Sequence, residues 1–255
     1  MDSFDDEEGK TVWPAGHRAA FCLVAIVLGP TATNSAADEL FAAEPYGATG
    51  LGALLDLLDD LDLSATIAPD AAALHAYAPL LRRCHASGHE LAVAGERDAA
   101  DGIERTIQTL HHIAGGSPIG IVNRVMAGAD TPAFGWAHWQ LASATTDRPT
   151  LTDRSPGEVA LVTLPGNPFW VDATWLSPAR PSPPSALLES WTLSMDAVRA
   201  TGGLMTVVVH PHLIARLGIR STLTRFLDES IGSGDVWIAP AAEIATWWRE
   251  NRRQD

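Results

Sequence analysis

Histidines at two spacings are the first candidates for chemistry. His210-Pro211-His212 follows a run of apolar residues, Leu204–Val209, that predicts a buried strand. Side chains two residues apart on a strand point the same way, so the two rings could form a pair of metal ligands. We instead expect His210 to lie at the carboxyl end of the strand and His212 to belong to the next loop. His210 is then either a functional group or a hydrogen-bonded structural histidine.

The second spacing is His85-x-x-x-His89, which would bring two rings to one face of an uninterrupted helix. Gly88 is expected to end the helix between them. We therefore interpret this spacing as coincidence, because a histidine at a helix C-terminus is favoured by the helix dipole alone.

Tryptophans are the other conspicuous side chains. Trp136, Trp139, Trp170 and Trp175 lie in the least regular third of the chain. An indole offers a rigid surface on which a sugar or aromatic ligand can stack. Packing in the core or under a loop explains each of them equally well, so both interpretations stay open. Trp247 and Trp248 are expected to cover the fold or a subunit contact.

Charge excludes several classes of protein. The 255 residues include 17 Lys plus Arg and 31 Asp plus Glu, a formal net charge of −14. Nucleic acids and anionic membranes are bound mainly by clustered basic residues, so neither is an expected partner. Two cysteines provide no disulfide framework and no zinc-ribbon spacing, which favours the reducing cytoplasm.

Five of the first ten residues are acidic, which is unlike a secretory signal and predicts a flexible tail, residues 1–10, before one domain spanning 11–255. The longest apolar run, residues 19–28, covers only about half of the roughly 20 residues that a membrane-spanning helix needs. We expect it to be a strand.

Strands and helices alternate in the predicted order. The expected elements are strand 19–28, helix 46–61, strand 65–68, helix 70–85, strand 89–94 and helix 103–113, then an irregular stretch 115–185 with strand 158–164, and then helix 184–200, strand 204–209, helix 222–231, strand 236–239 and a last helix from Pro240. This alternation indicates an α/β fold with a parallel sheet, either doubly wound or closed as a barrel.

Motifs spread over the chain resemble those of a known family. In chain order these motifs are Trp13-Pro14-Ala15-Gly16, Tyr46-Gly47, Gly88-His89-Glu90-Leu91-Ala92, the segment from Gly203 to Ile214, Val236-Trp237-Ile238-Ala239 and Glu243-Ile244-Ala245. Their order is similar to that in the polysaccharide deacetylases. These are NodB-homology proteins, and the resemblance is to their cytosolic branch of allantoinase-like and peptidoglycan-deacetylase-like members. It implies a distorted (β/α) barrel that hydrolyses non-peptide C–N bonds with a divalent metal, whose role is to activate water and polarise the carbonyl.

The resemblance also implies which positions should hold that metal. The family's Asp-x-Asp pair at the end of the first strand corresponds here to Val27 and Gly29. The family's two ligand histidines correspond to Ala94 and Asp98. A lone Asp98 would bind zinc weakly. The family also has an arginine that follows a glycine in a later motif, and the corresponding arginine of this chain is Arg124. What is retained is His210, at the family's proton-donating histidine, and Asp172, near its acidic pair.

The sequence thus predicts a deacetylase-like barrel without the family's metal site and without a cofactor. Candidate residues are His210 and Asp172 for catalysis, and Trp170, Trp136, His89 and Arg124 for substrate contact. We expect a small-molecule enzyme with metal-independent acid–base chemistry in the former pocket. The alternatives are a non-catalytic subunit or ligand-binding scaffold paired with an intact relative, and an ordinary metal-dependent deacetylase. A homo-oligomer, or a hetero-oligomer with that relative, is expected.

Overall fold

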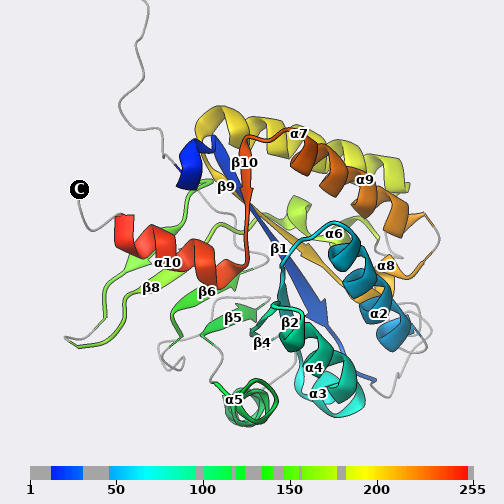
Figure 1. Ribbon diagram of the computed structural model, residues 1–255, viewed down its shortest axis with the longest axis vertical. Coiled ribbons are helices and arrows are strands. Elements are labelled where there is room, and N and C mark those ends of the chain that lie inside the picture. Colours follow the sequence, from blue (N-terminus) through cyan, green and yellow to red (C-terminus); the bar gives the residue numbers. More distant parts are fainter. Residues whose placement is uncertain are drawn as a thin grey trace, which may run out of the picture.

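Two five-stranded sheets form the centre of the protein (Figure 1). The computed structural model describes residues 13–30, 46–95, 100–116, 119–123, 134–139, 146–154, 157–176, 182–216 and 218–251. In the first sheet, β1 (Ala19–Val27) pairs in parallel with β9 (Leu204–Val209), β10 (Val236–Ile238) and β2 (Thr66–Pro69), and β2 pairs with β3 (Glu90–Leu91). β10 pairs with the first part of β1 and β2 with its last part.

The second sheet has the order β4-β5-β6-β8-β7. Its strands are β4 (Val93–Ala94), β5 (Gly120–Asn123), β6 (Trp136–Trp139), β8 (Leu161–Leu164) and the antiparallel edge strand β7 (Thr150–Thr152). The chain passes directly from β3 to β4 through Ala92, and Val171 forms a bridge with Val208 of β9. The sheets are therefore joined on both sides into a distorted (β/α) barrel.

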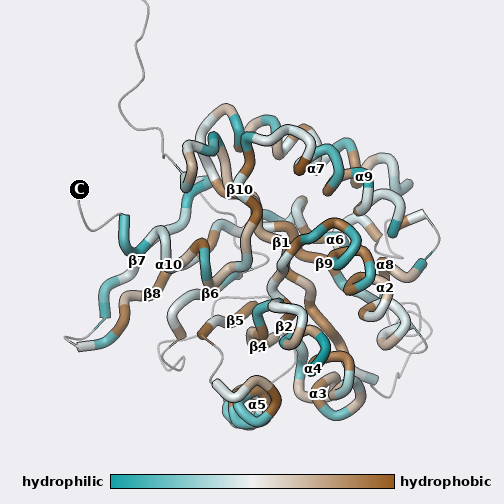
Figure 2. Tube along the Cα trace, viewed as in Figure 1, coloured by the Kyte–Doolittle hydropathy of each residue, from teal (hydrophilic) through white to brown (hydrophobic). Residues whose placement is uncertain are grey.

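Side chains of β1 alternate between the two hydrophobic clusters of the core. Ala20, Cys22, Val24, Ile26 and Leu28 belong to the cluster inside the barrel, and the residues between them, from Ala19 to Val27, pack on the outer helices. Every residue of β1 is buried, which is why the strand is a continuous apolar run (Figure 2).

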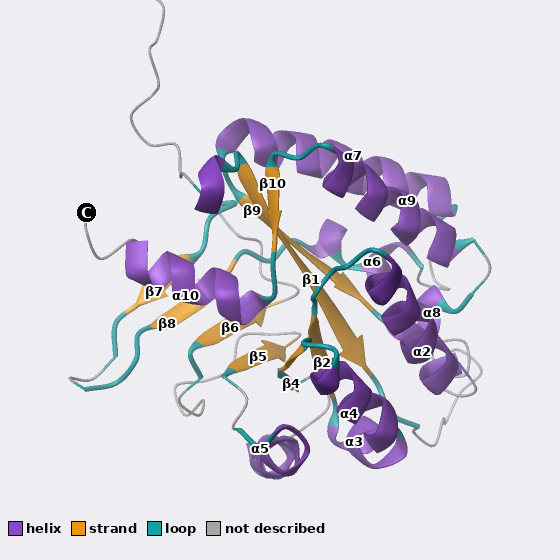
Figure 3. Cartoon of the chain, in the orientation of Figure 1, coloured by secondary structure: helices purple, strands orange, loops and turns teal. Residues whose placement is uncertain are grey.

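Helices cover the outside of the strands (Figure 3). They are α2 (Tyr46–Asp60), α3 (Ala71–Ala76), α4 (Ala78–Ala86), α5 (Ala100–Ala114), α7 (Pro184–Thr201) and α9 (Ile219–Gly232), with the short α6 (Asp172–Trp175), α8 (Pro211–Ile214) and the 3₁₀ turns η1 (Pro14–Gly16) and η2 (Pro168–Trp170). The last helix, α10 (Ala241–Asn251), differs because Ala241, Ile244, Ala245 and Trp248 contribute to the inner cluster. None of the helices in the described ranges is long and apolar enough to span a bilayer.

Most predicted elements are confirmed, with two corrections. The helix expected over 70–85 is two helices that meet at Tyr77, because Pro79 has no N–H to continue the first of them. The strand expected over 89–94 is divided between β3 and β4, which belong to different sheets.

The stretch treated as irregular contains three strands that the sequence pattern did not show, β5, β6 and β7. Each has only three or four residues, too few for a periodic pattern to stand out. The proposed acidic tail, residues 1–10, lies outside the described residues.

Candidate active site at the carboxyl ends of the strands

Asp172 and His210 form a buried pair. Nδ1 of His210 lies 2.6 Å from Oδ1 of Asp172, and the backbone N–H of His210 donates to Oδ2 at 2.7 Å. Both residues are almost fully buried, Asp172 at 0% and His210 at 4% exposure. With the carboxylate accepting at Nδ1, Nε2 is the ring atom that can take up or release a proton.

The fold positions this pair from two sides. The backbone stays extended at His210 (φ −113°, ψ 111°), so its side chain continues the inward alternation of Val208 at the end of β9. Asp172 follows directly after Val171, the residue that bridges to Val208. Catalytic groups of (β/α) barrels gather at this carboxyl end of the strands.

Helix α2 packs closely behind the histidine. A Cβ atom placed on Gly50 would lie 2.0 Å from the carbonyl oxygen of Pro211, so only glycine allows this approach. The rings of His210 and His212 meet edge to face, with centroids 5.8 Å apart. His212 is buried in α8 and not in an open loop, which corrects the expectation.

The end of β1 offers no carboxylate. Val27 faces the outer helices, and the inward positions beside it are Ile26 and Leu28. At Gly29 a Cβ atom would lie 2.2 Å from the backbone nitrogen of Ala73, so this backbone leaves no room for an aspartate side chain.

A nearby carboxylate performs a structural task. Asp70, after β2, accepts hydrogen bonds from the N–H groups of Gly29 (2.9 Å) and Ala73 (2.7 Å). It therefore caps α3 and holds the end of β1 against it.

The residues at the positions where metal ligands are expected do not form a suitable set of ligands. Ala94, at a ligand position, is a buried methyl group in the inner cluster, and Asp98 lies outside the described residues. Among the residues that the structure describes, no group of three or more His, Cys, Asp or Glu side chains is arranged to hold a metal ion. These described residues therefore give no basis for a reaction step that uses a bound metal.

His138 is a candidate that sequence reasoning missed. Its neighbours Trp136 and Val122 belong to the inner cluster while Ala137 and Trp139 belong to the outer one, so the alternation directs His138 into the barrel. It is fully buried. Burial lowers its pKa to about 4, although the Pro165 carbonyl acts in the opposite direction. The signal available in the sequence was a histidine within a short aromatic strand, Trp136-Ala137-His138-Trp139.

Two of the predicted substrate contacts lie at the opposite end of the barrel. Trp136 begins β6, and its indole N–H donates to Oε1 of Glu90 at 2.8 Å. His89 precedes β3 and is buried, and its Nδ1 accepts from the N–H of Ala65 at 3.3 Å. The structure does not bring either residue to Asp172 and His210.

The other two predicted contacts are not placed at the pair either. Trp170 is buried in the outer cluster, between sheet and helices, although it precedes Asp172 by two residues. Arg124 lies outside the described residues.

Glu90 is the centre of a structural network at that opposite end. Its Oε2 accepts from Thr66 Oγ1 (2.8 Å) and from the N–H of Ala242 (2.9 Å), and Thr66 Oγ1 accepts from the N–H of Ala241. Burial raises the pKa of Glu90 to about 6, and its hydrogen bonds oppose the shift. The carboxylate thereby ties the start of α10 to β2, β3 and β6.

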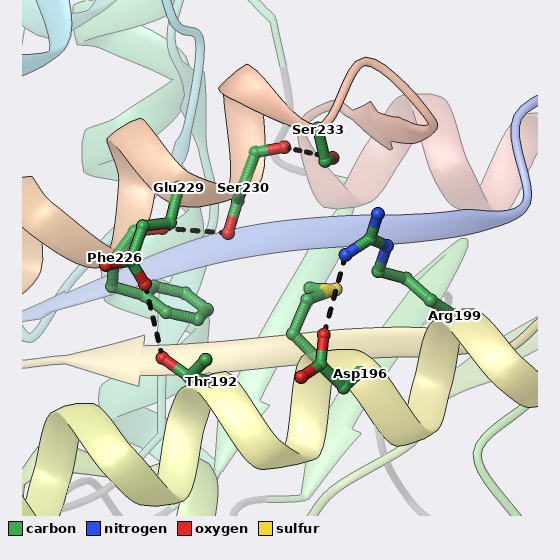
Figure 4. Close-up of a pocket in the computed structure, with 8 residues that line it drawn as sticks. Thr192, Asp196, Arg199, Phe226, Glu229, Ser230 and Ser233 are labelled. Atoms are coloured by element: carbon green, nitrogen blue, oxygen red, sulfur yellow. Dashed lines mark hydrogen bonds and ion pairs between the residues drawn. The ribbon is translucent and has the colours of Figure 1, made fainter.

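A hollow on the outer surface is too small to be the site. It lies between α7 and α9, has a volume of about 40 Å³ and is crossed by the side-chain contact of Thr192 on α7 with Glu229 on α9 (Figure 4). It contains neither Asp172 nor His210.

Solved structures share this architecture. A protein assigned as a polysaccharide deacetylase from Mycobacterium smegmatis superposes with a TM-score of 0.78 at 23% identity, over 95% of this chain and 94% of that one. A PuuE allantoinase and a Pseudomonas aeruginosa PAO1 protein assigned as a polysaccharide deacetylase give TM-scores of 0.80 and 0.82 at 18% identity, each over 98% of both chains. The chain has the polysaccharide deacetylase fold. No family model and no curated protein matches its sequence.

The same fold occurs in a pseudoenzyme. A CE4 family pseudoenzyme from Bacillus anthracis gives a TM-score of 0.52 at 12% identity, over 89% of this chain and 65% of that one. The deacetylase fold is therefore found both in proteins assigned as enzymes and in a protein described as a pseudoenzyme.

Proposed function

We propose that this protein binds a small molecule at the carboxyl ends of its strands and performs metal-independent acid–base chemistry there. The observation that carries the proposal is the buried pair of Asp172 and His210, held by two hydrogen bonds of 2.6 and 2.7 Å. A buried imidazole oriented by a carboxylate is a standard arrangement for moving a proton to or from a bound substrate.

Each part of the pair has a separate role in this proposal. Asp172 fixes the tautomer and the orientation of the ring and stabilises the imidazolium when it forms. Nε2 of His210 is the atom that accepts or donates the proton. General acid–base catalysis supplies about 10²–10⁴-fold, which suits isomerisation, elimination, cyclisation or another proton transfer.

Amide hydrolysis is the less suitable reaction for these residues. Water must be activated before it can attack an amide, and a bound metal ion does this by lowering the pKa of the water and polarising the carbonyl. Ile26, Leu28 and Ala94 give the inner surface near the end of β1 apolar side chains instead. Such apolar side chains cannot activate a water molecule, so they favour a reaction that does not need one.

The test is a screen for turnover by the full chain. We would incubate the purified protein with a metabolite extract and follow by mass spectrometry which compounds disappear. Wild type should consume a compound in the presence of a chelator, and His210→Ala should abolish this, with Asp172→Asn lowering the rate. Stoichiometric zinc together with chelator-sensitive hydrolysis of N-acetyl sugars would instead establish ordinary deacetylation.

A non-catalytic role is the second candidate, favoured by the similarity to the Bacillus anthracis pseudoenzyme. In that case, the chain is a subunit or ligand-binding scaffold, alone as a homo-oligomer or paired with an intact relative. Copurification of such a relative, with no compound consumed and no effect of His210→Ala, would support this role over the catalytic one.

A further inference from the structure

A second hollow lies between α3 and α5, away from Asp172 and His210. Its volume is about 320 Å³, at the lower end of the range typical for small-molecule pockets. The residues that line it are Ala71, Ala72, Leu74 and His75 of α3 and Arg105, Thr106 and Thr109 of α5. Its wall is thus apolar on one part of α3 and polar along α5.

Thr106 contributes an unusual hydroxyl to this wall. The side chain is 1% exposed, and its Oγ1 has no hydrogen-bond partner within the described part of the chain. Four of the other helical threonines, Thr109, Thr222, Thr224 and Thr246, donate to the carbonyl four residues earlier, and Thr192 and Thr201 have other acceptors. A buried hydroxyl without a partner costs about 1–3 kcal/mol. A ligand in the hollow would supply the missing acceptor.

Arg105 and His75 supply further donors beside this hydroxyl. Both are exposed, and within the described residues neither makes an ion pair. Arg83 on α4 shows the contrast, since it contacts Asp56 and Asp59 at 2.8 and 2.7 Å. An arginine at a hollow with no carboxylate among the described lining residues is suited to an anionic ligand.

We propose that this hollow binds a small organic anion, a carboxylate or a phosphate ester with a short apolar body. The guanidinium of Arg105, the imidazole of His75 and the hydroxyl of Thr106 would donate to its oxygens. The Thr109 hydroxyl already donates to the Arg105 carbonyl at 2.9 Å and is not a further donor. Ala71, Ala72 and Leu74 would contact the apolar body.

The experiment uses phenyl phosphate, benzoate, inorganic phosphate and neutral benzyl alcohol as probes, titrated into the full chain by calorimetry. We expect saturable binding of phenyl phosphate or benzoate, and which of the two binds more tightly identifies the anion. Benzyl alcohol and inorganic phosphate should bind more weakly. No saturable binding of either aromatic anion below about 10 mM, or equal binding of benzyl alcohol, would overturn the proposal.

Variants separate the site from general charge effects. Arg105→Gln should weaken anion binding at least about tenfold. Arg220→Gln, an exposed arginine on α9 with the same change in net charge, should not weaken it. Unchanged binding in Arg105→Gln would contradict the site.

Thr106→Val adds a signature that a structural threonine would not give. Valine has nearly the same shape, so the variant should raise the melting temperature of the free protein while weakening anion binding about tenfold. A lower melting temperature would show that the hydroxyl has a structural partner and would count against the proposal.

Discussion

The buried His138 makes a quantitative prediction about stability and pH. Its pKa is about 4 in the folded protein, against an ordinary value of 6.5. Between these two values the unfolded chain binds more protons than the folded one, so the free energy of unfolding must fall as the pH falls. At pH 5 this single group should lower the stability by about 2 kcal/mol, and at pH 7 by almost nothing.

Glu90 opposes this effect in the wild-type protein. Its pKa is raised to about 6, so the folded state binds the proton more tightly and gains stability as the pH falls through that value. His89, whose pKa is lowered by burial, acts in the same direction as His138. The wild-type pH profile therefore mixes terms of both signs and cannot isolate His138.

Replacing the ring isolates its contribution. We would measure urea unfolding of wild type and His138→Leu at pH 7 and pH 5, where leucine suits the apolar neighbours Val122 and Leu164. The stability difference between the two proteins should shift by about 2 kcal/mol in favour of the variant on going to pH 5. An identical difference at both pH values for His138→Leu would refute the burial argument.

Two substitutions test the packing around the candidate site and the network opposite it. Gly50→Ala should destabilise the protein by about 1–3 kcal/mol, because the new Cβ meets the Pro211 carbonyl, whereas Gly52→Ala in the same helix meets nothing within 4 Å and should stabilise it by about 1 kcal/mol. Thermal unfolding measures both, and equal effects would contradict the close approach of α2. Trp136→Phe should cost about 1–3 kcal/mol, since it removes the indole N–H that Glu90 accepts, and should not change the proton-transfer activity that we propose. A selective loss of that activity in Trp136→Phe would instead support the substrate contact predicted from the sequence.

Local patterns predicted the elements that are long enough to show a period. The apolar run over β1 and the three- and four-residue spacing of leucines in α2 were sufficient for those elements. The short strands β5, β6 and β7 were missed because their stability comes from neighbouring strands and not from their own composition. The division of residues 89–94 between two sheets likewise depends on pairing partners distant in the chain.

The sequence by itself determined the α/β order, the likeness to the deacetylases, and the absence of acidic residues at the end of the first strand. Only the tertiary structure decided which residues meet. Asp172 and His210 are 38 residues apart and become a pair because Val171 bridges to β9. The alternation along β6, which pairs with β5 and β8, turns His138 inward. His89 and Trp136 stand at the starts of β3 and β6 and therefore lie at the far end of the barrel. Residue type and spacing are local properties, whereas the distance between side chains depends on long-range strand register.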